Sequence, residues 1–106
     1  MTEKLEVLKK IDPLLFHTKR LIILSLLIAI GPLTQGNLRK KGQLTWGTLT
    51  AHLKQLERAG YIQQKDVISI YGPRVLVNIT EKGLKIYDET LLQLKEFIDT
   101  SKIDSD

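Results

Sequence analysis

Side chains able to contact a nucleic acid follow one face of the segment 45–59. On a helical wheel, Leu49, Leu53 and Leu56 fall within about 60° of one another and form an apolar stripe. Small residues on the opposite face would permit close approach, hydroxyl and amide groups would meet base edges, and cations would meet phosphates. This pattern predicts a helix that enters a major groove, although a solvated helix face has a similar composition. The outer side chains are Trp46, Gly47, Thr48, Thr50, Ala51, Lys54, Gln55 and Arg58.

Basic side chains also lie on both sides of this segment. Arg39, Lys40 and Lys41 come just before it, Lys65 follows it on a predicted strand, and Arg74 lies in a predicted turn. Residues 38–74 hold seven basic and two acidic side chains, a net charge of +5, whereas the whole chain carries +4. A basic run is often only solvated surface. Three separate basic features on one predicted face favour a polyanionic partner.

Capping residues divide the N-terminal part into helices. An apolar helix is predicted over 16–30, ended by Gly31-Pro32, and Thr34 can cap a short third helix to about Lys41. Gly42-Gln43-Leu44 is a predicted turn. Thr45 is a good N-cap for a helix to about Ala59, and Gly60 can end that helix in the left-handed conformation. A first amphipathic helix, bent near Pro13, is expected from the spacing of Leu5, Leu8, Ile11 and Leu15.

The periodicity changes after Gly60. Residues 61–70 and 75–79 are rich in β-branched and aromatic side chains, and Tyr71-Gly72-Pro73-Arg74 between them predicts a hairpin turn. Thr80 with Glu81 then opens a long helix to about Thr100. Two helices joined by a short turn and followed by a hairpin are the parts of a winged helix-turn-helix. The expected fold is therefore α+β and mostly helical, with a two-stranded wing and a long C-terminal helix.

The stretch LTWGTLTAHLKQLERAGYI, residues 44–62, resembles the recognition-helix signature of small winged-helix transcriptional regulators. It is most similar to the single-domain MarR/ArsR-like type, which is common in prokaryotes. Gly72-Pro73-Arg74 resembles the wing tip of that group, and residues 79–83 (ITEKG) resemble the start of its last helix. The sequence departs from the group at Gly36-Asn37, and it lacks the cysteines of metal-sensing members.

The resemblance implies a homodimeric, sequence-specific regulator that binds double-stranded DNA. Its recognition helix would be about 45–59, and its wing, about 68–75, would lie on the adjacent minor groove or backbone. Arg74 could instead fold back and pair with Asp66 on the facing strand. The expected DNA contacts are Arg39, Lys40, Lys41, Thr45, Trp46, Gly47, Thr48, Thr50, Ala51, Lys54, Arg58, Lys65 and Arg74.

The last predicted helix supports a dimer independently. Its apolar residues alternate at spacings of three and four, as in a heptad seam. They are Leu84, Tyr87, Leu91, Leu94 and Ile98. Such a seam could also pack on its own domain. Leu5 and Leu8 of the first predicted helix could add to the same interface.

Composition excludes several other classes of protein. The 106 residues fit one domain, expected over 1–100 with a polar tail at 101–106. Without cysteine there is no disulfide scaffold or zinc ribbon. The apolar run 21–30 is half the length of about 20 residues that a bilayer requires. We therefore expect a cytoplasmic protein.

Catalysis has no sequence support. The two histidines, His17 and His52, lie near no pattern for a nucleophile, a metal or a phosphate loop. We expect no enzyme, no metal and no cofactor. The same fold can also serve as a protein-interaction module in a transcription or repair assembly. Exposed aliphatic side chains on the outer face of the helix 45–59 or on the basic stretch from the turn to the wing would favour that alternative over DNA binding.

Overall fold

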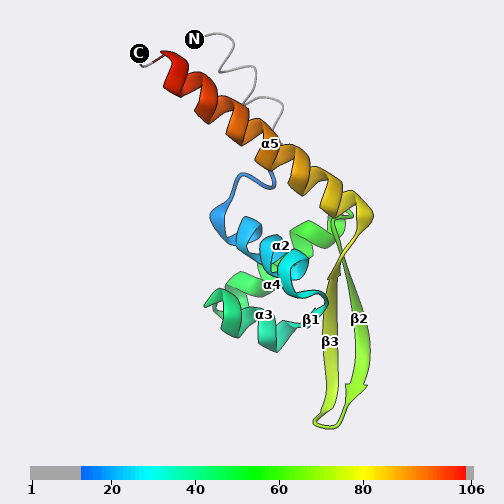
Figure 1. Ribbon diagram of the computed structural model, residues 1–106. Coiled ribbons are helices and arrows are strands. Elements are labelled where there is room, and N and C mark those ends of the chain that lie inside the picture. Colours follow the sequence, from blue (N-terminus) through cyan, green and yellow to red (C-terminus); the bar gives the residue numbers. More distant parts are fainter. Residues whose placement is uncertain (1–12, 105–106) are drawn as a thin grey trace.

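The computed structural model describes residues 13–104 and confirms a mostly helical winged helix (Figure 1). The predicted first helix, with Leu5 and Leu8, lies outside the described residues. The last helix continues to Asp104, beyond its expected end near Thr100. No helix in the described part of the chain is both long and apolar enough to span a bilayer. The elements in order are α2 (Thr18–Ile30), β1 (Leu33–Thr34), α3 (Gln35–Gly42), α4 (Trp46–Arg58), β2 (Ile62–Ser69), β3 (Gly72–Ile79) and α5 (Glu81–Asp104).

Hydroxyl caps set the start of both helices of the helix-turn-helix. The Thr34 side chain accepts a hydrogen bond from the backbone N–H of Asn37 (3.2 Å), which begins α3 despite the glycine at position 36 in its first turn. Thr45 does the same for the N–H of Thr48 (3.2 Å) at α4. Gln43 adopts a left-handed conformation (φ 54°) between them, and Gly60 (φ 81°) follows α4. These caps explain why the predicted bounds of α4 agree with the structure.

The sheet has three strands rather than the expected two. All neighbours are antiparallel, in the order β1-β3-β2. The additional strand, β1, is only two residues long, and it pairs Leu33 with Val77 and Thr34 with Leu76. So short a strand has no periodicity of its own. It is a strand only because β3 supplies its hydrogen-bonding partners.

The predicted turn at 71–74 is wrong. Ser69 pairs with Gly72, so the turn consists of Ile70 and Tyr71, and Arg74 belongs to β3 opposite Val67. Gly72 has a positive φ (101°), whereas neither turn residue does. Glycine therefore occupies the position after the turn, as in a type I turn followed by a bulge, and not the centre of the turn.

The predicted stripe of α4 forms the centre of the core. Leu49, Leu53 and Leu56 are at most 2% exposed. They belong to one cluster with Ile23 and Leu24 of α2, and α3 and both long strands add further members. This packing fixes the inner face of α4 and leaves its opposite face toward solvent.

Close packing and a hydrogen bond help to attach α5 to the rest of the domain. A Cβ built on Gly83 would lie 2.1 Å from the carbonyl oxygen of Tyr61, so only glycine allows this approach. The hydroxyl groups of Ser25 and Tyr87 share a hydrogen bond of 2.6 Å between α2 and α5. Beyond these contacts the C-terminal half of α5 projects away from the other labelled elements (Figure 1).

Candidate nucleic-acid interface

The outer face of α4 is exposed over its whole length, as predicted from the wheel. Thr50, Ala51, Lys54 and Arg58 are all exposed. Gly47 is exposed too, and a Cβ at this position would meet no atom within 4 Å. A surface with small residues at one end and cations at the other can approach a polyanion closely.

Thr48 lies at the edge of this face rather than at its centre. It is half-buried, and its hydroxyl accepts a hydrogen bond from the hydroxyl of Thr45 (2.9 Å). Thr45 itself is exposed while it caps the helix. The two hydroxyls therefore stabilise the start of α4, and Thr50 is the threonine of the outer face that is free of this network.

The aromatic ring of Trp46 connects the first turn of α4 with α3. The Arg39 guanidinium carbon lies 5.1 Å from the Trp46 ring centroid, within cation–π range. Trp46 is 51% exposed, whereas Arg39 is half-buried. Arg39 Nε is a buried donor without a hydrogen-bond partner among the described residues. The stacked ring orients this cation without neutralising its charge.

An open pocket of about 560 Å³ separates α3 and Trp46 from the hairpin. The side-chain amide of Gln35, one of the lining residues, donates a hydrogen bond to the amide oxygen of Gln64 (2.6 Å), which joins α3 to β2. Sequence reasoning missed this bridge, because a glutamine pair 29 residues apart gives no pattern. The lining residues are Gln35, Gly36, Arg39, Lys40, Trp46, Asp66, Pro73, Arg74 and Val75.

The pocket brings together three of the predicted cations. Arg39 and Lys40 come from α3 and Arg74 from β3, and Asp66 is the one acidic residue in the lining. Arg74 donates from Nη1 to the carbonyl of Pro73 (2.7 Å). Among the described residues it has no carboxylate partner, so the expected alternative pairing with Asp66 does not occur.

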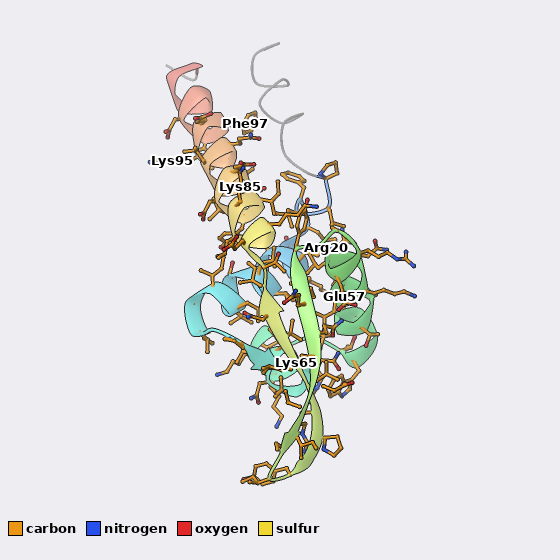
Figure 2. The ribbon with its side chains drawn as sticks, turned by 90° about the vertical axis from the view of Figure 1, so that its right-hand side faces the viewer. Arg20, Glu57, Lys65, Lys85, Lys95 and Phe97 are labelled. Atoms are coloured by element: carbon orange, nitrogen blue, oxygen red, sulfur yellow. The ribbon has the colours of Figure 1, made fainter. Side chains whose placement is uncertain are left out.

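Two other predicted cations lie elsewhere. Lys41 is exposed at the end of α3 and does not line the pocket. Lys65 borders a second open hollow with Glu57 and Gly60, away from Arg39 and Arg74. Figure 2 labels Lys65 on the hairpin and Glu57 on α4. The cationic surface is thus divided between two sides of the hairpin.

The predicted seam of α5 divides into two sets. Tyr87 and Leu94 are partly buried, and Tyr87 is bonded to Ser25 of the same chain. Leu84, Leu91 and Ile98 are 39%, 42% and 52% exposed. These three recur every seven residues, so they form one line along the helix. Tyr87 packs against the core of its own domain, whereas the second set is exposed in the single chain.

His52 connects the recognition helix with α2. Arg20 Nε donates to His52 Nδ1 (3.0 Å), and Arg20 Nη1 donates to the Leu14 carbonyl (3.0 Å). The rings of His17 and His52 lie 4.6 Å apart. Burial, together with the positive charges of this cluster, lowers the pKa of His52 below its ordinary value of 6.5. His52 is therefore a buried packing residue. Among the described residues no group of histidine and acidic side chains could hold a metal ion.

Comparison with known proteins identifies the family. The family model for winged helix DNA-binding domains matches residues 19–98. An uncharacterized protein of Methanocaldococcus jannaschii, MJ0432, is 34% identical over 83 residues, which cover 76% of this chain and 90% of that protein. A transcriptional regulator homologue from Pyrococcus horikoshii OT3 is 33% identical, with a TM-score of 0.83 over 90% of this chain and 96% of the other.

More distant solved structures share the fold. A MarR-family regulator from Silicibacter pomeroyi is 21% identical, with a TM-score of 0.63 over 92% of this chain and 65% of that chain. The MepR–DNA complex of S. aureus is 22% identical, with a TM-score of 0.68 over 99% and 84% of the two chains. This chain belongs to the winged helix DNA-binding domain family, and its fold is that of the MarR-like transcriptional regulators.

Proposed function

We propose that the chain is a homodimeric transcriptional regulator that binds double-stranded DNA sequence-specifically. The observation that carries this proposal is the position of Arg39, Lys40 and Arg74 around one pocket, beside the exposed face of α4. Cations from two elements flank a helix whose outer face is small and polar. A recognition helix in a major groove needs this arrangement, because base edges and flanking phosphates must be contacted together.

The outer face of α4 would read bases. Thr50 and Lys54 present a hydroxyl and an ammonium group that can meet base edges, and Gly47 and Ala51 allow the backbone to come close. Thr48, at the edge of the face, would contact the same groove by donating its own hydroxyl proton, because its hydroxyl oxygen only accepts from Thr45. Lys41, Arg58 and Lys65 would contact phosphates farther along the duplex.

The line of Leu84, Leu91 and Ile98 would supply the dimer contact. An isolated domain gains nothing from three large apolar side chains in one exposed row, whereas two copies of α5 would bury them as a heptad seam. The solved complex of MepR with DNA, which has the same fold, supports DNA as the partner.

A salt titration of DNA binding tests the proposal. The full chain is titrated against a fluorescent duplex pool of random sequence at several salt concentrations, with fluorescence anisotropy as the readout. We expect log affinity to fall linearly with log salt concentration, because bound cations release counterions from the duplex.

Charge variants make this test specific to the site. Lys40→Ala and Arg74→Ala should each reduce the salt slope by about one per subunit, because each removes one phosphate contact. Lys85→Ala removes an exposed cation of α5 and is the matched control, with an unchanged slope expected. Equal effects of all three substitutions would contradict the proposed interface.

A further inference from the structure

The tip of the wing carries the most exposed large apolar side chains in the described chain. Ile68 is 92% exposed, Ile70 90% and Tyr71 77%. Figures 1 and 2 show this end of the hairpin projecting beyond the helices. Apolar side chains gathered at one exposed place usually mark a contact surface.

The turn itself does not require these residues. Asn, Asp and Gly are favoured in hairpin turns, whereas Ile and Tyr contribute nothing to the turn geometry. Ser69 stabilises the turn instead, since its hydroxyl accepts from the Tyr71 N–H (3.1 Å) and donates to the Gly72 carbonyl (2.8 Å). Ile70 and Tyr71 are therefore held on a hydrogen-bonded turn, away from the core of the domain.

The tip extends from the cationic pocket. Asp66 and Val75 pair across the hairpin where it lines the pocket, and Ile70 follows four residues after Asp66. Pro73 also lines the pocket and pairs with Ile68, so at about 3.3 Å per residue Ile70 lies about 7 Å beyond the edge of the pocket. The stretch 67–80 contains no acidic residue, and Arg74 is its one cation.

We propose that Ile70 and Tyr71 form an apolar wedge that enters the minor groove of DNA and kinks it. This inference rests on the proposed function, because it requires α4 to hold the duplex. Charge favours DNA as the occupant of the tip, since the uncharged tip follows on a pocket whose lining holds the three cations Arg39, Lys40 and Arg74 against one acidic residue, Asp66. Arg74, two pairs back from the tip, can contact phosphates while the apolar tip enters between them.

The chemistry of the two side chains fits this role. Isoleucine is among the residues that wedge between base steps in minor-groove proteins, which bend DNA by about 20–90°. The flat ring of Tyr71 can stack on an unstacked base. The wedge would select sites with a TA or CA/TG step under each wing, because these steps unstack at the lowest cost. Specificity would then arise at positions that α4 does not touch.

A bending measurement tests the wedge. Duplexes are first selected from a random-sequence pool by the wild-type chain, and one of them is labelled at both ends for energy transfer. The variant Ile70→Asn/Tyr71→Asn removes the apolar surface and keeps side chains that favour turns. The matched control Ile70→Leu/Tyr71→Phe keeps the apolar surface. Circular dichroism and thermal unfolding are used to check that both variants fold as the wild type does.

We expect the wild type and the control to shorten the end-to-end distance of the duplex. The asparagine variant should still bind but leave the duplex straight, and selection with it should lose the TA and CA/TG steps under the wings. An unchanged bend with the asparagine variant would overturn the wedge. A variant that changes self-association and not bending would overturn it too, and would make the tip a protein contact. If the wild type selects no duplex, the proposed function itself fails.

Discussion

The guanidinium group of Arg39 lies over the ring of Trp46 with 5.1 Å between the guanidinium carbon and the ring centroid. This contact joins the last turn of α3 to the first turn of α4, the two helices of the helix-turn-helix. It holds a cation beside the exposed end of the recognition helix. The relative position of the two helices and the charge of the interface thus depend on the same pair.

The pair gives a prediction that separates charge from orientation. Arg39→Ala should weaken DNA binding on all sequences and lower the salt slope by about one per subunit, because a phosphate contact is lost. Trp46→Ala keeps the charge of Arg39 and removes the ring, so the affinity for DNA should fall with little change in the salt slope. Trp46→Phe keeps an aromatic ring and should retain most of the affinity. Anisotropy titrations at several salt concentrations measure both quantities. An Arg39→Ala variant with an unchanged slope would place this cation outside the DNA contact.

The exposed line of α5 predicts the oligomeric state. Leu91→Asp with Ile98→Asp would place charges in an apolar interface, so the protein should sediment as a folded monomer. Both positions are exposed in the single chain, and the core should therefore tolerate the change. Lys85→Asp, on another face of α5, is the control and should leave the dimer intact. A wild-type chain that sediments as a folded monomer at micromolar concentration would disprove the dimer.

The approach of Gly83 to Tyr61 predicts a large effect on stability. Gly83→Ala would place a Cβ 2.1 Å from a backbone oxygen and 2.8 Å from Ile79 Cγ1, so α5 must shift. We expect a loss of about 2 kcal/mol or more in the free energy of unfolding. Gly47→Ala is the matched control, since its Cβ would meet open space, and it should gain about 0.5–1 kcal/mol. Urea denaturation measures both, and similar values for the two variants would refute the close packing.

Acid should destabilise the protein through His52. Its pKa is lowered in the folded state by burial first, and then by the positive charges of His17, Arg20 and Lys19. Below pH 6.5 the unfolded chain therefore binds more protons than the folded one, so stability falls as the pH decreases from there. A protonated Nδ1 of His52 could also no longer accept the hydrogen bond from Arg20 Nε.

The test compares urea unfolding at pH 7.5 and 5.5. His52→Gln keeps an acceptor for Arg20 and does not titrate, so its stability should change less between the two pH values than that of the wild type. Equal pH dependence in both proteins would assign the acid sensitivity to other groups.

The parts of the fold that depend on local chemistry could be predicted from the sequence. Thr34, Thr45 and Gly60 mark helix ends through interactions with their immediate neighbours in the chain. The spacing of Leu49, Leu53 and Leu56 determines the inner face of α4. Once this buried stripe is known, the residues on the opposite face of the helix are known as well. The predicted DNA-contacting face of α4 is therefore the exposed one.

The remaining features depend on pairing between distant segments. β1 exists only because β3 lies beside it, and the Gln35–Gln64 bridge depends on the same docking. The predicted hairpin turn differs from the observed one because glycine and proline usually mark the centre of a turn. The register of β2 and β3 instead places Gly72 directly after the turn. As a consequence Arg74 lies on β3, two pairs back from the end of the hairpin, and Ile70 and Tyr71 form the turn that the prediction had assigned to it.

Hydroxyl-radical footprinting on a selected duplex tests the central claim most directly. A homodimer with one α4 in each half-site should protect two patches related by two-fold symmetry, with centres one helical turn, about 10–10.5 base pairs, or a multiple of it apart. Thr50→Ala should keep this pattern and lower affinity for the selected duplex by about 1–3 kcal/mol, with a much smaller loss on random DNA. A single unsymmetrical patch, or protection that is the same on selected and random duplexes, would contradict sequence-specific binding by a dimer.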